Sequence, residues 1–234
     1  MTFSITAKCE KTGQFGVAVS TAVPGVGGLC PFAKAGVGAI ASQSFVNPYI
    51  GINGLKYLEQ GLSAQEVADK VLAEDPLPEQ RQFSIVDKDG NAISYSGDQC
   101  DTWYGHKTGE NYAVAGNMLV DENTVAAAAK AFEKNADLTL SDRLLCALEA
   151  GQAAGGDKRG RQSAALYVVH EEDYAFCDLR VDEHIDPVKE LRRVYEVAQE
   201  QLAPLVAMLP TKKHPAGRFD FDHSRELGLL QDDK

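Results

Sequence analysis

The sequence lacks any apolar run near the roughly 18 residues of a membrane-spanning helix. Its start also lacks a basic stretch followed by a long apolar one, so no secretory signal is predicted and a cytoplasmic location is expected. Basic residues are scarce, with 23 Lys and Arg against 34 Asp and Glu and a net charge of −11. Nucleic acids and anionic membranes require a basic surface, so a small molecule or another protein is the expected partner.

Cysteines are few, and none forms a CxxC pair. They are odd in number and widely scattered, which predicts reduced structural thiols rather than disulfides or a zinc site. The cysteines are Cys9, Cys30, Cys100, Cys146 and Cys177.

The chain also lacks internal repeats, a Ser/Gly linker and any block of like charge. Its 234 residues, 44% of them hydrophobic, are enough for one large globular domain. The sequence therefore predicts a single domain over residues 1–209, followed by a polar C-terminal extension over 210–234.

Hydrophobic periodicity predicts the order of the elements. Alternating apolar residues predict strands at 2–9, 15–21, 36–45, 112–119, 163–170 and 174–181, and a hairpin around Asp89-Gly90. Helical periodicity predicts helices at 51–60, 63–74, 121–135, 141–152 and 186–208. Runs of strands separated by paired helices are typical of an α+β protein with mostly antiparallel sheets covered by helices.

The first strand begins at Thr2, directly after the initiator methionine. A hydroxyl needs a base to act as a nucleophile at neutral pH. A terminal threonine supplies its own base, because an α-amine has an ordinary pKa of about 7.7–8.0. Removal of Met1 would therefore make Thr2 a candidate nucleophile. An ordinary strand residue at an ordinary terminus is the alternative.

Lys34 is the candidate for placing positive charge beside this terminus, where it would lower the pKa of the hydroxyl or amine. It lies in the otherwise apolar stretch CPFAKAGVGAIA, where a solvated lysine is less expected. The alternative is that Lys34 marks an exposed strand edge.

The stretch GGDKRGRQSAAL concentrates polar groups at the start of a buried strand. An arginine fork there can bind a carboxylate or phosphate through two parallel bonds, so an anionic substrate is expected. The alternative is a turn after a helix whose charges pair with each other, for example Asp157 with Arg161. The candidate substrate-binding residues of this stretch are Asp157, Arg159, Arg161, Gln162 and Ser163.

Side-chain amides at strand ends are candidate donors to a substrate or to the oxyanion of an acyl-transfer reaction. Gln43 and Asn47 stand at the C-terminal end of the third predicted strand, and Asn117 lies near the end of another. Asn residues are also common in turns.

Neither a metal nor a cofactor is predicted. Asp182, His184 and Asp186 alternate like metal ligands on an extended chain, but Asp186 is expected to cap a helix, and the other histidines show no ligand spacing. The glycine-rich PGVGGLCP lacks the lysine and the Ser or Thr of a phosphate-binding loop.

Several segments together resemble a bacterial family of unknown function that is assigned to the N-terminal nucleophile (Ntn) hydrolase superfamily. They are MTFSITA, TAVPGVGGLCPFAKAGVGAIASQSFVNPYIG, QFSIVDKDGNAISYSG, GHKTGENYAVAGNML, EAGQAAGGDKRGRQSAAL and DLRVDEHIDP. The resemblance spans roughly residues 2 to 200, and GGDKRGRQSAA is its most specific part. It implies a four-layer αββα sandwich and cleavage of amide bonds by an N-terminal Thr, Ser or Cys.

Within this resemblance, Thr2 matches the nucleophile position and Lys34 matches the activating lysine of proteasome-like members. The aspartate that such members carry early in the second strand has no match, because Val17, Ala18 and Val19 occupy that region. This departure disfavours a proteasome-type mechanism.

The leading hypothesis is an amidohydrolase acting on a small amide or related C–N bond. In this hypothesis Thr2 attacks the carbonyl, Lys34 stabilises charge, Asn117 and backbone N–H groups hold the oxyanion, and the arginine region binds an anionic substrate. The alternative is a non-catalytic ligand-binding or assembly protein on the same scaffold. Formation of a homo-oligomer is also expected, although the sequence indicates no interface.

Overall fold

The computed structural model describes residues 2–218, 225 and 228. The chain divides into two compact units, residues 1–191 and residues 192–234. The boundary near residue 209 that composition suggests stays a prediction, and much of the predicted extension lies outside the described residues, as does Met1. Everything below concerns the first unit unless stated otherwise.

The larger sheet has six strands in the order β10-β9-β2-β1-β8-β7. Its strands are β1 (Thr2–Lys8), β2 (Phe15–Thr21), β7 (Trp103–Gly109), β8 (Tyr112–Leu119), β9 (Ser163–Val169) and β10 (Cys177–Val181). All of its strand pairs are antiparallel. β1 therefore lies inside the sheet, with β2 on one side and β8 on the other.

The smaller sheet has four antiparallel strands in the order β3-β4-β5-β6. Its strands are β3 (Pro31–Lys34), β4 (Gly38–Ser44), β5 (Arg81–Asp87) and β6 (Ala92–Ser96). The helices are α1 (Pro48–Glu59), α2 (Ala64–Glu74), α3 (Asn123–Lys134), α4 (Leu140–Ala153), α5 (Pro187–Gln201) and α6 (Ala203–Val206).

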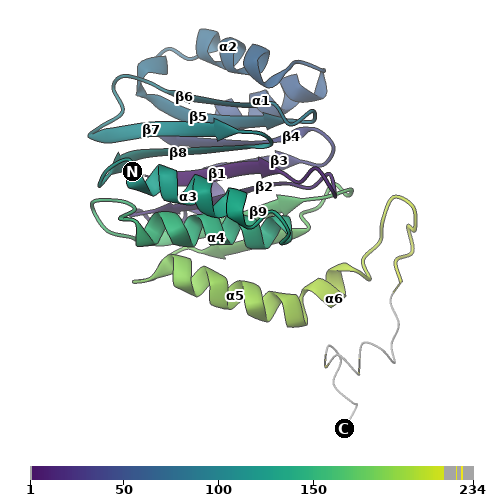
Figure 1. Ribbon diagram of the computed structural model, residues 1–234. Helices are drawn as coiled ribbons and strands as arrows, with labels where there is room; N and C mark the ends of the chain where they lie inside the picture. Colours follow the sequence, from purple (N-terminus) through teal and green to yellow (C-terminus); the bar gives the residue numbers. More distant parts are fainter. Residues whose placement is uncertain (1, 219–224, 226–227, 229–234) are drawn as a thin grey trace. The chain divides into compact units, whose positions relative to one another are not determined.

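The two sheets face each other, and a helix pair covers the outer face of each (Figure 1). α1 and α2 contact the smaller sheet, whereas α3 and α4 contact β1, β2 and β8 of the larger one. β1 also contacts β4 and β5 across the space between the sheets. The predicted α+β class and four-layer αββα sandwich are confirmed.

Alternation along β1 explains these layers. Phe3 and Ile5 are buried on the helix-facing side, where the ring of Phe3 comes so close to Gly151 of α4 that a side chain there would collide with it. Ser4, which lies between them, faces the smaller sheet, where its hydroxyl donates to Gln43. Thr2 is on the same side of the strand as Ser4, because side chains alternate along a strand. A strand that is polar on its buried inner face is unusual, and this feature locates the candidate site.

Three elements differ from the sequence-based prediction. β3 and β7 were not predicted, because β3 has only four residues after a Gly/Pro-rich loop and β7 is interrupted by a bulge between Trp103 and Gly105. The helix predicted over 186–208 is instead two helices, α5 and α6, divided at Leu202. The capping box of Ser63 and Glu66 at the start of α2 is confirmed.

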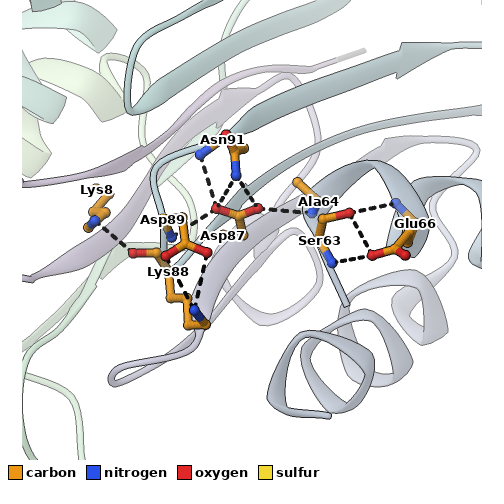
Figure 2. Close-up of polar contacts among 8 residues, drawn as sticks. All are labelled: Lys8, Ser63, Ala64, Glu66, Asp87, Lys88, Asp89 and Asn91. Atoms are coloured by element: carbon orange, nitrogen blue, oxygen red, sulfur yellow. Dashed lines mark hydrogen bonds and ion pairs between the residues drawn. The ribbon is translucent and has the colours of Figure 1, made fainter. Parts of the chain in front are cut away.

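Asp87 joins the β5–β6 hairpin to the start of α2 (Figure 2). Its Oδ1 accepts the backbone N–H groups of Asp89 and Asn91, each at 3.0 Å, and its Oδ2 accepts that of Ala64 at 3.0 Å. Asp87 is only 3% exposed. A buried carboxylate is stable there because it satisfies several donors of a tight turn and of a helix N-terminus.

We expect Asp87→Asn to lower the free energy of unfolding by about 1–3 kcal/mol, because the amide nitrogen cannot accept a hydrogen bond and leaves buried N–H groups unpaired. Urea unfolding followed by circular dichroism measures this change. The matched control is Asp89→Asn, whose carboxylate is 67% exposed and pairs only with Lys88 among the described residues. Equal stability of the two variants would contradict the role of Asp87.

Candidate active site

Thr2 lies at the point where β1 begins, between two polar residues of neighbouring strands. It is directly opposite Thr21 of β2 and Asn117 of β8. Its hydroxyl donates to Oγ1 of Thr21 at 3.2 Å, and the residue is 7% exposed. The backbone register therefore sets two side chains with hydrogen-bonding groups beside the Thr2 hydroxyl.

Two residues connect Thr2 to the smaller sheet. Nε2 of Gln43, on β4, lies 3.5 Å from the carbonyl oxygen of Thr2 and donates to Oε1 of Gln82 at 2.8 Å. The hydroxyl of Ser4 donates to Oε1 of Gln43 at 2.6 Å. The side chain of Gln43 thus spans the space between the sheets, and both its amide oxygen and its amide nitrogen are hydrogen-bonded.

Gln82, on β5, is the centre of this network. Its Oε1 also accepts Nδ2 of Asn117 at 2.9 Å, while its Nε2 donates to Oγ of Ser96 and to the carbonyl oxygen of Gly116, both at 2.8 Å. Gln82 is fully buried. Because a buried amide without partners is costly, this satisfied arrangement fixes the positions of the surrounding side chains.

The network ends at His106 of β7. Nδ1 of His106 is 2.9 Å from Oγ of Ser96. Partial desolvation of the ring lowers the pKa of His106 below its ordinary value, although the residue is exposed at the edge of the sheet, and this shift favours the neutral form. The network therefore consists of uncharged groups from Thr2 to His106.

The backbone is strained directly after two of the amide residues. Ser44 follows Gln43 with a φ of 71°, and Met118 follows Asn117 with a φ of 51°. Positive φ is uncommon outside glycine and clusters at functional sites, where the surrounding structure holds it in place. Both strained residues lie at strand ends next to the Thr2 network.

The loop between α4 and β9, residues 154–162, occupies the position in the larger sheet that precedes Thr2 along the line of β1. Asp157 pairs with Leu119 of β8, and its Oδ2 accepts the backbone N–H of Ala22, which follows Thr21, at 3.1 Å. Leu119 is the last residue of β8 and Ala22 directly follows β2, so both lie beyond the residues of these two strands that face Thr2. Asp157, which is 5% exposed, therefore lies in line with the start of β1.

The other polar residues of this stretch have specific partners. Nη2 of Arg159 is 3.4 Å from Oδ2 of Asp157, and Nη1 of Arg161 is 3.2 Å from Oδ1 of Asp186. The alternative pairing of Asp157 with Arg161 is thus not the one observed. Charge pairing within the turn is present, and the side chains of both arginines stay more than 40% exposed.

Gln162 and Ser163 hold the loop against β2. The backbone N–H of Gln162 donates to the carbonyl oxygen of Thr21 at 2.8 Å. The Ser163 hydroxyl donates to the carbonyl oxygen of Val23 at 2.6 Å and accepts the N–H of Val26 at 3.2 Å. The Ser163 side chain is therefore occupied by the loop that follows β2.

The structure does not bring Lys34 to Thr2. Lys34 lies opposite Gly38 at the start of β4, and its Nζ pairs with Oε1 of Glu59 at 2.5 Å. Gln43, which contacts Thr2, is five residues further along β4, a distance of about 17 Å at about 3.3 Å per residue. The antiparallel β3–β4 hairpin thus sends Lys34 to the opposite end of the sheet, which is a correction to the sequence-based hypothesis.

Asn47 is also separate from the Thr2 network. Its Oδ1 accepts the N–H of Tyr49 as the cap of α1, and its Nδ2 donates to Oδ2 of Asp75 at 2.7 Å. Asp75 in turn pairs with Arg81 through two hydrogen bonds of 2.9 and 3.0 Å. Asn47 therefore stabilises the start of α1, and its side chain does not contact Thr2.

We expect Asp75→Asn to lower the free energy of unfolding by about 3–5 kcal/mol at pH 7, because Arg81 is left buried without its counter-ion. Burial raises the pKa of Asp75, but hydrogen bonds from Arg81, Asn47 and the Leu77 N–H hold it below its ordinary value. The stabilisation is therefore present above the unfolded pKa of about 3.9 and lost as the pH falls through the lower folded value.

Unfolding free energies measured from pH 7 down to pH 2 check this prediction. The parent protein should lose stability below about pH 4 more steeply than Asp75→Asn does, since the variant has no carboxylate to protonate. Asp69→Asn, on the exposed face of α2, is the control and should follow the parent. Parallel curves for Asp75→Asn and the parent would contradict the prediction.

We also expect Gln82→Met to destabilise the protein by at least about 2 kcal/mol, because it keeps the side-chain size but leaves Asn117, Gln43 and Ser96 without their partner. Gln65→Met, on exposed α2, should change stability by no more than about 0.5 kcal/mol. Urea unfolding compares them. A Gln82→Met variant as stable as Gln65→Met would show that the network does not hold the sheets in place.

Sequence reasoning missed several residues of the site. Thr21, Gln82, Ser96 and His106 were not candidates, although Thr21 and Gln82 are fully buried. Thr21, Gln82 and Ser96 are polar residues within predicted strands, and this was their only signal. His106 lies in β7, which was not predicted. Which polar residues meet across the sheets depends on strand order, which the pattern alone does not give.

Two further findings concern the described residues as a whole. No group of three His, Cys, Asp or Glu side chains among them is arranged to hold a metal ion. None of the helices in the described part of the chain is both long and apolar enough to cross a membrane.

Comparison with known families places this site in context. A model of a family of unknown function, DUF1028, matches residues 2–191, which include every residue of the Thr2 network. The chain belongs to this family. The predicted membership in a family of unknown function is thus confirmed.

Solved structures show the same fold. The crystal structure of a DUF1028 protein from Silicibacter pomeroyi is 30% identical, with a match covering 94% of this chain and 99% of that chain at a TM-score of 0.86. No functionally curated protein is similar enough in sequence to match.

Two Anbu (ancestral beta-subunit) structures are more distant. The one from Yersinia bercovieri is 13% identical, with 89% of this chain and 98% of that chain covered at a TM-score of 0.39. A mutant from Hyphomicrobium sp. strain MC1 is 13% identical, with 86% and 96% covered at a TM-score of 0.42. We transfer no residue role from either one.

Proposed function

We propose that the protein is an N-terminal-nucleophile amidohydrolase that cleaves a small amide or related C–N bond with Thr2 after removal of Met1. The observation that carries this proposal is the position of the Thr2 hydroxyl. It lies at the very start of an internal strand, within hydrogen-bonding distance of Thr21 and directly opposite Asn117. A nucleophile held by neighbouring strands is oriented without help from a mobile loop.

The base in this mechanism is the α-amine of Thr2 itself. With a pKa near its ordinary value of about 7.7–8.0, the amine is partly neutral at pH 7 and takes the proton as the hydroxyl attacks. Asp157 supports this role, because it lies in line with β1 just ahead of Thr2. Its carboxylate would hold the ammonium group that forms, and Lys34 has no part in this step.

The reaction is an acyl transfer in two steps. Oγ1 of Thr2 bonds to the amide carbon, the C–N bond breaks, and the proton held by the α-amine leaves with the amine product. Water then hydrolyses the Thr2 ester, releasing the acid and restoring the hydroxyl. Nδ2 of Asn117 gives one of its two hydrogens to Gln82, so its other N–H is the side-chain donor we assign to the oxyanion. Nε2 of Gln43 becomes a second donor when it releases the carbonyl oxygen of Thr2, which it contacts at 3.5 Å.

Arg159 is the residue we assign to an anionic group of the substrate. Its guanidinium meets Asp157 through a single 3.4 Å contact and is 41% exposed, so it can turn toward a second carboxylate. Arg161 is paired with Asp186, and its side chain is 43% exposed, so it can also turn toward a substrate carboxylate. It lies further along the loop from Asp157 than Arg159 does. An amide that also carries a carboxylate is therefore the substrate class that best fits this turn.

One observation favours the alternative of a non-catalytic ligand-binding protein. Thr2 is 7% exposed and its hydroxyl proton is donated to Thr21, so little of the residue is open to a substrate in this conformation. A nucleophile must be reached by its substrate. The two functions therefore differ in whether a small electrophile acylates Thr2.

We expect a β-lactone probe to add once to Met1-free protein and not at all to protein that retains Met1. Intact-mass spectrometry measures both the processing of Met1 and the gain in mass. Thr2→Ala should lose the adduct and Thr2→Ser should keep it, because only the hydroxyl and the terminal amine are required. Thr12→Ala, in the exposed β1–β2 turn, is the control and should be labelled like the parent.

Three outcomes reject the enzymatic proposal. The first is an equal adduct on Thr2→Ala, which would place the reactive group elsewhere. The second is no adduct on Met1-free protein, and the third is full retention of Met1 by the protein isolated from its native host. Either of the last two supports the non-catalytic alternative.

A further inference from the structure

A groove lies on the side of the sandwich where β3 and β10 form the edges of the two sheets. It has a volume of about 260 Å³. Pockets for small ligands typically begin near about 300 Å³, so this one suits a compact molecule. It is lined by Gly27, Gly28, Pro31, Phe32, Ala33, Leu55, Tyr167, Asp178 and Arg180. None of these residues contributes to the Thr2 network.

One wall of the groove is apolar. Phe32 comes from β3, and Leu55 comes from α1, which packs on β3. Both side chains are only partly buried, so they still present apolar surface to the hollow. A flat apolar group entering the groove would remove this surface from water, which is favourable in proportion to the area covered.

The opposite wall carries two hydrogen-bond donors that make no bond to any described residue. The hydroxyl of Tyr167 makes no hydrogen bond to any described residue. Burial, and then the nearby charge of Asp178, raise the pKa of Tyr167, so the hydroxyl keeps its proton at pH 7. Arg180 uses Nε and Nη2 to hold Asp178 at 2.9 and 3.0 Å, and its Nη1 donates to none of the described residues.

The charges around the groove disfavour an anion. Arg180 is neutralised by Asp178 and lies near the further negative charge of Asp182. A ligand carboxylate in the groove would therefore be repelled by Asp178 and Asp182. The one guanidinium that could attract it, that of Arg180, is already paired with Asp178. A neutral acceptor such as an amide oxygen accepts from the free donors without this repulsion.

We propose that the groove is a binding site for a small uncharged molecule with a flat apolar body and a carboxamide-type acceptor. The apolar body lies against Phe32 and Leu55, and the amide oxygen accepts from Tyr167 and Arg180. This site is separate from the proposed active site and does not depend on catalysis by Thr2.

Gly28 offers a way to close the groove. A Cβ built on Gly28 would meet nothing nearer than Nη1 of Arg180, at 3.9 Å, and the residue does not have the positive φ that restricts side chains. By contrast, a Cβ on Gly27 would collide with Ala165 at 2.8 Å. Gly28→Val therefore fills the groove while the surrounding backbone keeps its conformation.

The test uses benzamide as the neutral probe and benzoate as its charged isostere, titrated into ¹⁵N-labelled full-length protein and followed by amide chemical shifts. We expect saturable shifts around Gly28, Phe32 and Tyr167 with benzamide. Benzoate should bind at least roughly tenfold more weakly, because it places a second carboxylate beside Asp178.

Three variants locate the site. Gly28→Val should weaken benzamide binding at least roughly tenfold by occupying its space. Tyr167→Phe keeps the ring but removes the donor, and should weaken binding by about three- to tenfold. Tyr49→Phe is the matched control on an exposed tyrosine and should bind like the parent, as should Thr2→Ala.

Each of the following results overturns the proposal. They are an absence of saturable shifts at the groove, tighter binding of benzoate than of benzamide, and unchanged affinity in both Gly28→Val and Tyr167→Phe. If Gly28→Val does not fold, unchanged affinity in Tyr167→Phe alone overturns it. Because Thr2→Ala is measured in the same series, loss of this site is distinguished from loss of the proposed catalysis.

Discussion

The structure depends on the requirement that amide groups buried between two sheets be paired. Gln82 meets this requirement by accepting from Gln43 and Asn117 and donating to Ser96, so that strands of both sheets are joined through one side chain. An apolar layer tolerates small shifts of one sheet over the other, whereas directional bonds do not. The position of Thr2 follows from this constraint, since Gln43 contacts its carbonyl oxygen and Asn117 lies opposite it.

The space between the sheets is divided into two parts with different roles. Around β2, β9 and the start of β4, apolar side chains such as Val17, Val19 and Ala41 form a continuous core that supplies stability. Around the start of β1 and the parts of β5 and β8 that lie beside it, the same layer is polar and is held by the hydrogen bonds of Gln43 and Gln82. Further along β1, the buried hydroxyl of Thr6 has no hydrogen-bond partner among the described residues. The polar part lies where β1 begins and where Ser44 and Met118 adopt positive φ, so strain and buried polarity coincide at one end of the sandwich.

The sequence predicts the fold well because its signals are local. The Asp89-Gly90 turn, the Ser63 capping box and the strand alternation each act over a few residues, and each is confirmed. The grouping of Asn117, Asp157 and Gln162 around the start of β1 also agrees with their expected positions at strand ends. Lys34 could not be placed, because its location depends on the direction of β3, a short edge strand without its own pattern. Gln82 could not be recognised, because a glutamine in a strand has no distinguishing feature until its partners are known.

In the proposed mechanism the two sheets present the Thr2 hydroxyl for acyl transfer beside Asn117. The sharpest test of this mechanism is a crystal structure of Met1-free protein after reaction with a β-lactone. We expect an ester between the acyl carbon and Oγ1 of Thr2, with the acyl oxygen within hydrogen-bonding distance of Asn117 or Gln43. An adduct on another side chain, such as a cysteine, or a Thr2 ester whose acyl oxygen points away from both amides, would contradict it.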